Sequence, residues 1–108
     1  MKYALLAYNA PTTVQRGPIK PGIAEVLARP SVTGWARLQS AESATTLSSP
    51  GGKTLLTDGP FIDSKEYLGG LIMVEAANLD EALAIATELQ GLMAGGGAIE
   101  VRPILEDG

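Results

Sequence analysis

The sequence predicts an α+β fold in which an antiparallel sheet carries two helices on one face. Three observations predict it: apolar or alternating segments of strand length recur along the chain, two other segments have helical spacing, and a turn-forming segment separates two of the strands. The predicted order is strand, short helix, two or three strands, long helix, strand. At 108 residues the chain is expected to form a single domain over residues 1–108.

The first elements surround a proline-rich loop. Residues 2–8, KYALLAY, have the aromatic and aliphatic composition of a central strand. Residues 11–21 contain three prolines and Gly17 and predict a loop. Residues 22–30, GIAEVLARP, predict a helix of little more than two turns, which Pro30 ends because proline excludes its predecessor from helical geometry.

A hairpin is predicted in the middle of the chain. The threonine and β-branched content of residues 32–48 favours extended structure over more helix, above all in ATTLS, residues 44–48. Residues 49–52, SPGG, have the composition of a turn, and KTLLTD, residues 53–58, then forms the second strand.

The second half predicts a strand, the clearest helix and a last strand. GGLIMVEA, residues 69–76, has the pattern of a buried strand. In residues 78–95, Asn78 or Asp80 can cap the helix, glycines 95–97 end it, and the repeating positions are Leu79, Leu83, Ala86 and Leu89 or Gln90. AIEVRPI, residues 98–104, alternates, with Ile99 and Val101 on one face and Glu100 and Arg102 on a wet face.

Two residue types are missing from the sequence. It contains neither cysteine nor histidine, which removes disulfides, a thiolate nucleophile, the commonest general base and the usual metal ligands. We therefore expect no metal and no cofactor.

Charge and hydropathy limit the partners and the cellular location that we expect. The net charge is −4 and the eight basic residues are scattered, which argues against nucleic acid as a partner. The opening MKYALLAYNA is too short an apolar run for an export signal, and no segment approaches the roughly 18 apolar residues of a membrane span. A cytoplasmic protein that does not enter the membrane is expected.

The predicted sheet has a second face that its own helices leave uncovered. Alternate residues of LIMVEA and IEVRP line that face. An apolar open face needs cover, so we expect a homodimer that pairs sheet against sheet.

Two glycine-rich segments resemble nucleotide-binding loops only superficially. GGKT, residues 51–54, lacks the earlier glycine of a phosphate-binding loop, because position 47 is leucine, and it leads into a strand instead of a helix. Glycines 95–97 follow a helix instead of preceding one, which indicates a helix end.

The segment DGPFIDSKEYLGG, residues 58–70, brings charged, turn-forming and aromatic residues together. Asp58 can bond its own downstream amides in an Asx-turn, and Gly59 and Pro60 continue that turn. Phe61, the single phenylalanine, is expected to plug a core edge or wall a pocket.

Asp58 has two interpretations, and both stay open. In the structural one it forms the Asx-turn. In the functional one it lies at the mouth of a cleft that binds a small ligand through residues 58–61, with Lys65, Glu66 or Arg102 nearby. After it, Asp63 and Glu66 can form the capping box of one helical turn that ends at Gly69 and Gly70.

Three segments carry a family resemblance. MKYALLAY, GKTLLTDGPFIDSKEYLGGLIMVEAANLDEALAIA and GGAIEVRPI, in this order, resemble the DGPF-type proteins of the YCII-related family. The resemblance implies a ferredoxin-like domain that pairs into a dimeric α/β barrel. The region between Tyr8 and Gly34 is shorter than is usual for that family, which shortens the first helix.

The same resemblance implies three functional alternatives. The wider family includes enzymes with a His-Asp pair in a cleft near the dimer interface, one branch being a lyase-type dehydrochlorinase. Asp58 matches the acidic partner, but this chain has no histidine. A homodimer that binds a small organic ligand is therefore preferred over a lyase or isomerase in which Asp58 is general base and Lys65 or Arg102 steadies an enolate. The third alternative is a non-catalytic module that acts with a sigma factor.

Overall fold

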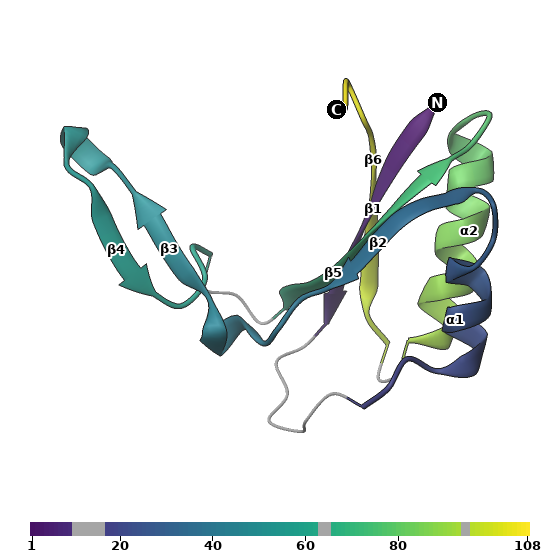
Figure 1. Cartoon of the computed structure of the whole chain (residues 1–108), viewed down its shortest axis with the longest axis horizontal. Coiled ribbons are helices and arrows are strands. Elements are labelled where there is room, and N and C mark those ends of the chain that lie inside the picture. Colours follow the sequence, from purple (N-terminus) through teal and green to yellow (C-terminus); the bar gives the residue numbers. More distant parts are fainter. Residues whose placement is uncertain (10–16, 63–65, 94–95) are drawn as a thin grey trace.

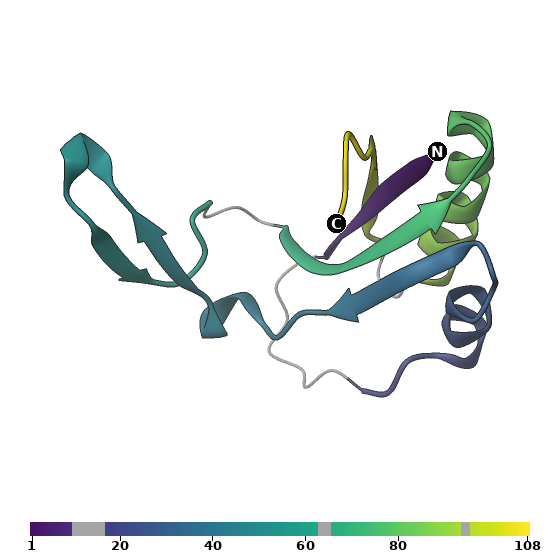
Figure 2. The same ribbon diagram turned by 45° about the horizontal axis from the view of Figure 1, so that its top comes forward.

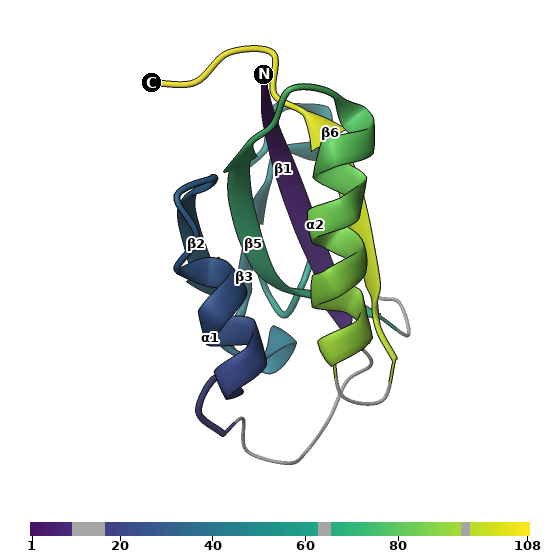
Figure 3. The same ribbon diagram turned by 90° about the vertical axis from the view of Figure 1, so that its right-hand side faces the viewer.

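The computed structural model describes residues 1–9, 17–62, 66–93 and 96–108. Its centre is a four-stranded antiparallel sheet of strand order β2-β5-β1-β6, and both helices cover one face of that sheet (Figures 1 and 3). The main elements are β1 (Lys2–Asn9), α1 (Pro21–Leu27), β2 (Val32–Arg37), β5 (Tyr67–Glu75), α2 (Leu79–Leu92) and β6 (Ala98–Pro103). This is the predicted α+β class in the ferredoxin-like arrangement.

The first strand is central, as its composition predicts. β1 pairs with β5 on one side and with β6 on the other. Tyr3 and Leu5 are buried because alternate residues of a strand point to the same face, here the face under the helices.

The core lies between the sheet and the helices. The cluster comprises Tyr3, Leu5, Val26, Ile72, Val74, Ala76, Ala82, Ile85, Ala86 and Leu89. Short alanine side chains let α2 approach the sheet, while Leu5 and Val74, both fully buried, fill the centre.

The long helix confirms one part of its prediction and corrects another. The Asn78 side chain accepts a hydrogen bond of 3.0 Å from the Glu81 amide, so Asn78 is the cap. The predicted repeat that includes Leu79 and Leu83 is wrong as a description of the buried face, because both leucines are exposed. Ala86 and Leu89 of that repeat are buried as predicted, and they face the sheet together with Ala82 and Ile85.

The short helix agrees closely with its prediction. α1 begins at Pro21, whose fixed φ suits the first turn, and ends at Leu27, three residues before Pro30. Val26 is the residue of this helix that is buried in the core.

The predicted hairpin forms, but it does not join the main sheet. β3 (Thr45–Ser48) and β4 (Leu55–Asp58) pair only with each other among the described strands, and they extend away from the rest of the molecule (Figure 2). Short 3-10 turns, η1 (Ala41–Ser43) and η2 (Pro50–Gly52), precede and connect them. We call residues 45–58 the arm.

Two glycine assignments need correction. β5 begins at Tyr67, so Gly69 and Gly70 lie within a strand and do not end a helical turn. Asp63, the other half of the predicted capping box, lies outside the described residues. α2 ends at Leu92, before the glycines; Gly95 is outside the described residues, and Gly96 has a positive φ of 65°.

Candidate functional site at the base of the arm

The Asp-Gly-Pro motif joins the arm to the rest of the chain. Gly59 has a φ of +99°, which side-chain-bearing residues rarely adopt. Its amide donates a hydrogen bond of 2.8 Å to the Ala44 carbonyl, and its carbonyl accepts one of 2.8 Å from the Thr46 hydroxyl. The turn therefore fixes both strands of the arm at their base.

Asp58 is the last residue of β4, and its carboxylate faces solvent. Within the described ranges it makes no hydrogen bond or ion pair, so the predicted Asx-turn is not formed there. Asp58 lies opposite Thr45, and Leu56 lies opposite Leu47. Since alternate residues share a face, Asp58 is on the same face of the arm as Leu47 and Leu56.

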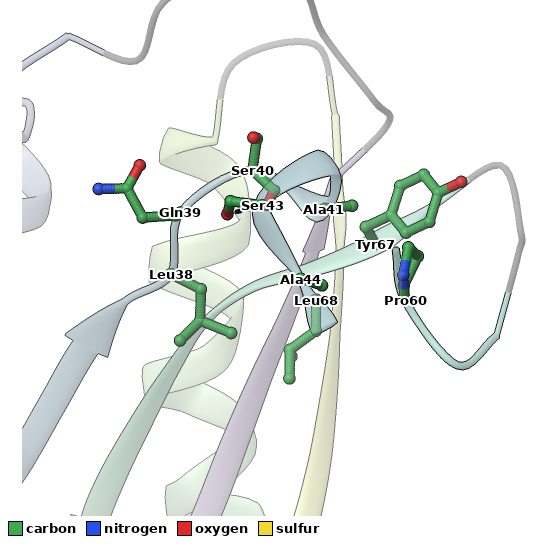
Figure 4. Close-up of a pocket in the computed structure, with 9 residues that line it drawn as sticks. All are labelled: Leu38, Gln39, Ser40, Ala41, Ser43, Ala44, Pro60, Tyr67 and Leu68. Carbon is green, nitrogen blue, oxygen red and sulfur yellow. Dashed lines mark hydrogen bonds between the residues drawn. The ribbon is translucent and has the colours of Figure 1, made fainter. Parts of the chain in front are cut away.

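A shallow pocket lies beside this motif. Its volume is about 270 Å³. Figure 4 shows lining residues from three segments, namely the connection from β2 to β3, the turn after β4 and the start of β5: Leu38, Gln39, Ser40, Ala41, Ser43, Ala44, Pro60, Tyr67 and Leu68.

The pocket lining is apolar with a few uncharged polar groups. No acidic or basic side chain is among these nine residues. The Ser43 hydroxyl is already engaged, donating a hydrogen bond of 2.6 Å to the Ser40 carbonyl. The side chains of Gln39 and Ser40 can orient a ligand, and the surface suits a neutral, partly apolar molecule.

Phe61 does not take its predicted place within one chain. It is 79% exposed, its neighbour Ile62 is 70% exposed, and neither lines the pocket. Phe61 therefore neither plugs a core edge nor walls this pocket in a single copy of the chain.

Of the predicted neighbours of Asp58, Arg102 is paired elsewhere. Lys65 lies outside the described residues, and Glu66 is exposed just before β5. Arg102, on β6, donates a hydrogen bond of 2.6 Å from Nε to Glu100, which raises the pKa of Arg102. Tyr8 donates to the other oxygen of Glu100 at 3.4 Å, so Arg102 belongs to a polar group on the sheet.

That polar group borders the open face, which we define as the sheet face away from the helices. Register places five apolar residues there, all at least partly exposed: Ala4, Leu6, Ala36, Leu71 and Met73. The predicted wet face of β6, with Glu100 and Arg102, continues this surface.

The described residues lack two further features. They contain no group of three or more acidic, histidine or cysteine side chains placed to hold a metal ion. None of the helices they form is long and apolar enough to cross a membrane.

Sequence reasoning missed most of the pocket. Residues 38–44 have no marked chemistry, and Tyr67 was assigned to a helical turn that does not form. The adjacent leucines 55 and 56 were the available signal for the arm. Neighbouring strand residues point to opposite faces, so two leucines in a row indicate that both faces need cover.

Comparison with known proteins identifies a family. Residues 1–106 match the YCII-related domain. An uncharacterized protein, R00369 of Rhizobium meliloti (strain 1021), is 42% identical over 69 residues, which is 64% of this chain. The matched part spans 56% of that relative's length.

Proposed function

Because the chain belongs to the YCII-related family, we propose that it binds a small organic ligand at the pocket beside the Asp-Gly-Pro motif, as a cytoplasmic homodimer of single-domain subunits of the DGPF type. The observation that carries this proposal is the pocket itself. It has a turn fixed by hydrogen bonds on one side and strand β5 on the other, and its lining is mainly apolar.

The pocket is small for a ligand site formed by one chain. Its volume of about 270 Å³ is just below the range of about 300–1,000 Å³ that is typical of small-molecule sites. A second copy that lies over the open face, as the resemblance to dimeric α/β barrels implies, would deepen such a shallow site. It would also cover Leu6, Leu71 and Met73.

Binding is preferred over catalysis by Asp58. The carboxylate does not line the pocket, and the chain has no histidine to work with it. The lyase or isomerase alternative requires a partner group that reaches Asp58 only in an assembly or on a ligand. Its test is turnover by Asp58→Asn, which that alternative predicts to be abolished in a folded protein.

A pocket-filling variant tests the binding proposal. A library of neutral aromatic and aliphatic fragments is screened by ligand-observed NMR against the wild type and two variants. Ala41→Phe fills the pocket, whereas Ala84→Phe adds the same ring on an exposed position of α2. Fragments that bind the wild type and Ala84→Phe but not Ala41→Phe would support the site. Binding that survives Ala41→Phe would contradict it.

A further inference from the structure

The chain exposes more surface than a compact monomer of its mass. Its accessible area is 7534 Å², whereas a folded monomer of 11.2 kDa is expected to expose about 5,700 Å². The excess, about 1,800 Å², exceeds the roughly 800 Å² that each partner buries in a standard stable interface. The radius of gyration, 15.4 Å, is likewise above the roughly 13 Å expected for this length.

The arm contributes to this excess. Leu47 is 65% exposed and Leu56 is 73% exposed, and the two lie opposite each other on one face of the arm. An isolated two-stranded hairpin is marginally stable in water, because it needs a third strand or a packed surface. The arm extends away from its own sheet and helices, so the described part of its own chain does not supply that surface (Figures 1 and 2).

The chain also has an uncovered apolar surface, which the arm of a second copy could cover. The open face carries Leu6, Leu71 and Met73, each only partly buried. Within one chain the arm does not meet this face. When two copies pair about a two-fold axis, the arm of each copy can cover the open face of the other. Among residues 45–58, Lys53 and Asp58 are the only charged side chains, and Asp58, at the base of the arm, shares the face of Leu47 and Leu56, so docking must leave its carboxylate solvated or paired.

We propose that the arm of each copy packs, through Leu47 and Leu56, against the open face of a second copy. This inference rests on the homodimer proposed above and adds the contact that holds it. It gives the exposed leucines their function, and it carries Asp58, on the same face of the arm, into the interface.

Cysteine cross-linking tests this contact directly, since the chain has no cysteine of its own. Leu56→Cys, bearing a C-terminal tag that separates mixed from uniform dimers, is co-expressed with Leu6→Cys or with Met73→Cys. The control partner is Ala84→Cys, on the exposed side of α2. After mild oxidation we expect several-fold more mixed disulfide with at least one open-face cysteine than with Ala84→Cys.

A matched pair of substitutions gives an independent readout by sedimentation. Leu56→Asp places a charge on the docking face, and Thr57→Asp places the same charge on the opposite face of the same strand. We expect Leu56→Asp to raise the dimer dissociation constant by about tenfold or more, and Thr57→Asp to leave it unchanged.

The outcomes separate this inference from the one on which it rests. A dimer that forms no mixed disulfide between arm and open face, or that tolerates both aspartates equally, would overturn the docking of the arm and leave the homodimer standing. A wild-type chain that sediments as a monomer would overturn both. Ligand binding lost in Ala41→Phe, with the cross-link retained, would support the pocket and the arm separately.

Discussion

The main sheet and the arm are both antiparallel β-structure, but leucine side chains are buried in the sheet and exposed in the arm. In the sheet, Leu5 is fully buried between two neighbouring strands and the helices. In the arm, Leu47 and Leu56 face each other across a strand pair and remain mostly exposed. Leu5 is covered by its own chain, whereas Leu47 and Leu56 are left mostly uncovered by theirs. Removing a side chain should therefore have different consequences in the two regions.

The largest effect is expected in the sheet. Leu5→Ala leaves a cavity in the fully buried centre of the core and should lower the free energy of unfolding by about 2–5 kcal/mol, measured by urea denaturation. Leu105→Ala, at a position that is 97% exposed, is the control and should change it by less than about 0.5 kcal/mol. A small loss for Leu5→Ala would contradict the placement of the core.

The next effect is expected at the base of the arm. Gly59→Ala forces a side chain into a backbone with φ of +99° and should cost about 1–2 kcal/mol locally. Hydrogen exchange of the residue 59 amide, which donates to Ala44, reports the opening of this turn. Gly91→Ala, on the exposed side of α2 with space around it, is the matched control. Equal protection of the amide in wild type and Gly59→Ala would show that the turn does not require glycine.

A smaller effect is expected at the start of α2. Asn78→Ala removes the acceptor of the Glu81 amide and should lower stability by about 0.5–2 kcal/mol. Asn78→Asp keeps a capping oxygen and should restore most of the loss. If alanine and aspartate behave alike in thermal denaturation, the cap has no energetic role.

The smallest effect concerns a surface ion pair near the helices. Arg29 donates two hydrogen bonds to Glu88, at 2.6 and 2.8 Å, and lowers the pKa of that carboxyl below its usual 4.5. Because the folded state then holds the proton less tightly than the unfolded chain, the contribution of the pair is present above the usual pKa and is lost as pH falls below it. Both groups are exposed, so the effect is small.

Unfolding measured between pH 6 and pH 3 checks this sign. Stability of the wild type should fall more steeply toward low pH than that of Glu88→Gln. A variant with an equally steep fall would exclude Glu88 as a source of the pH dependence.

The sheet was predictable from sequence because its signals are local and mutually consistent. The alternation of Ile99 and Val101 with Glu100 and Arg102 predicted the wet face of β6, and Asn78 predicted the start of α2. Leu79 and Leu83 misled the prediction of the buried face, because helical spacing alone does not say which of two overlapping stripes faces a sheet. The small residues Ala82 and Ala86 allowed the closer approach.

The site was less predictable because it depends on where segments meet. The bend at Gly59 was expected from the sequence and Pro60 lines the pocket, although Asp58 belongs to β4 and its Asx-turn is not formed. The remaining lining comes from residues 38–44 and from Tyr67 and Leu68, which are distant in sequence and have no chemical motif. The expected proximity of Asp58 to Arg102 followed from polarity alone, and the structure pairs Arg102 with Glu100 instead.

The molar mass in solution tests the central claim most directly, which is that the arm and the open face are covered by a second copy of the chain. Sedimentation equilibrium of the wild-type chain over a wide micromolar range should give twice the subunit mass of 11.2 kDa. Leu56→Asp should shift the mass toward that of the subunit as the protein is diluted, while Thr57→Asp stays dimeric. A wild-type mass of 11.2 kDa throughout the range would contradict the claim.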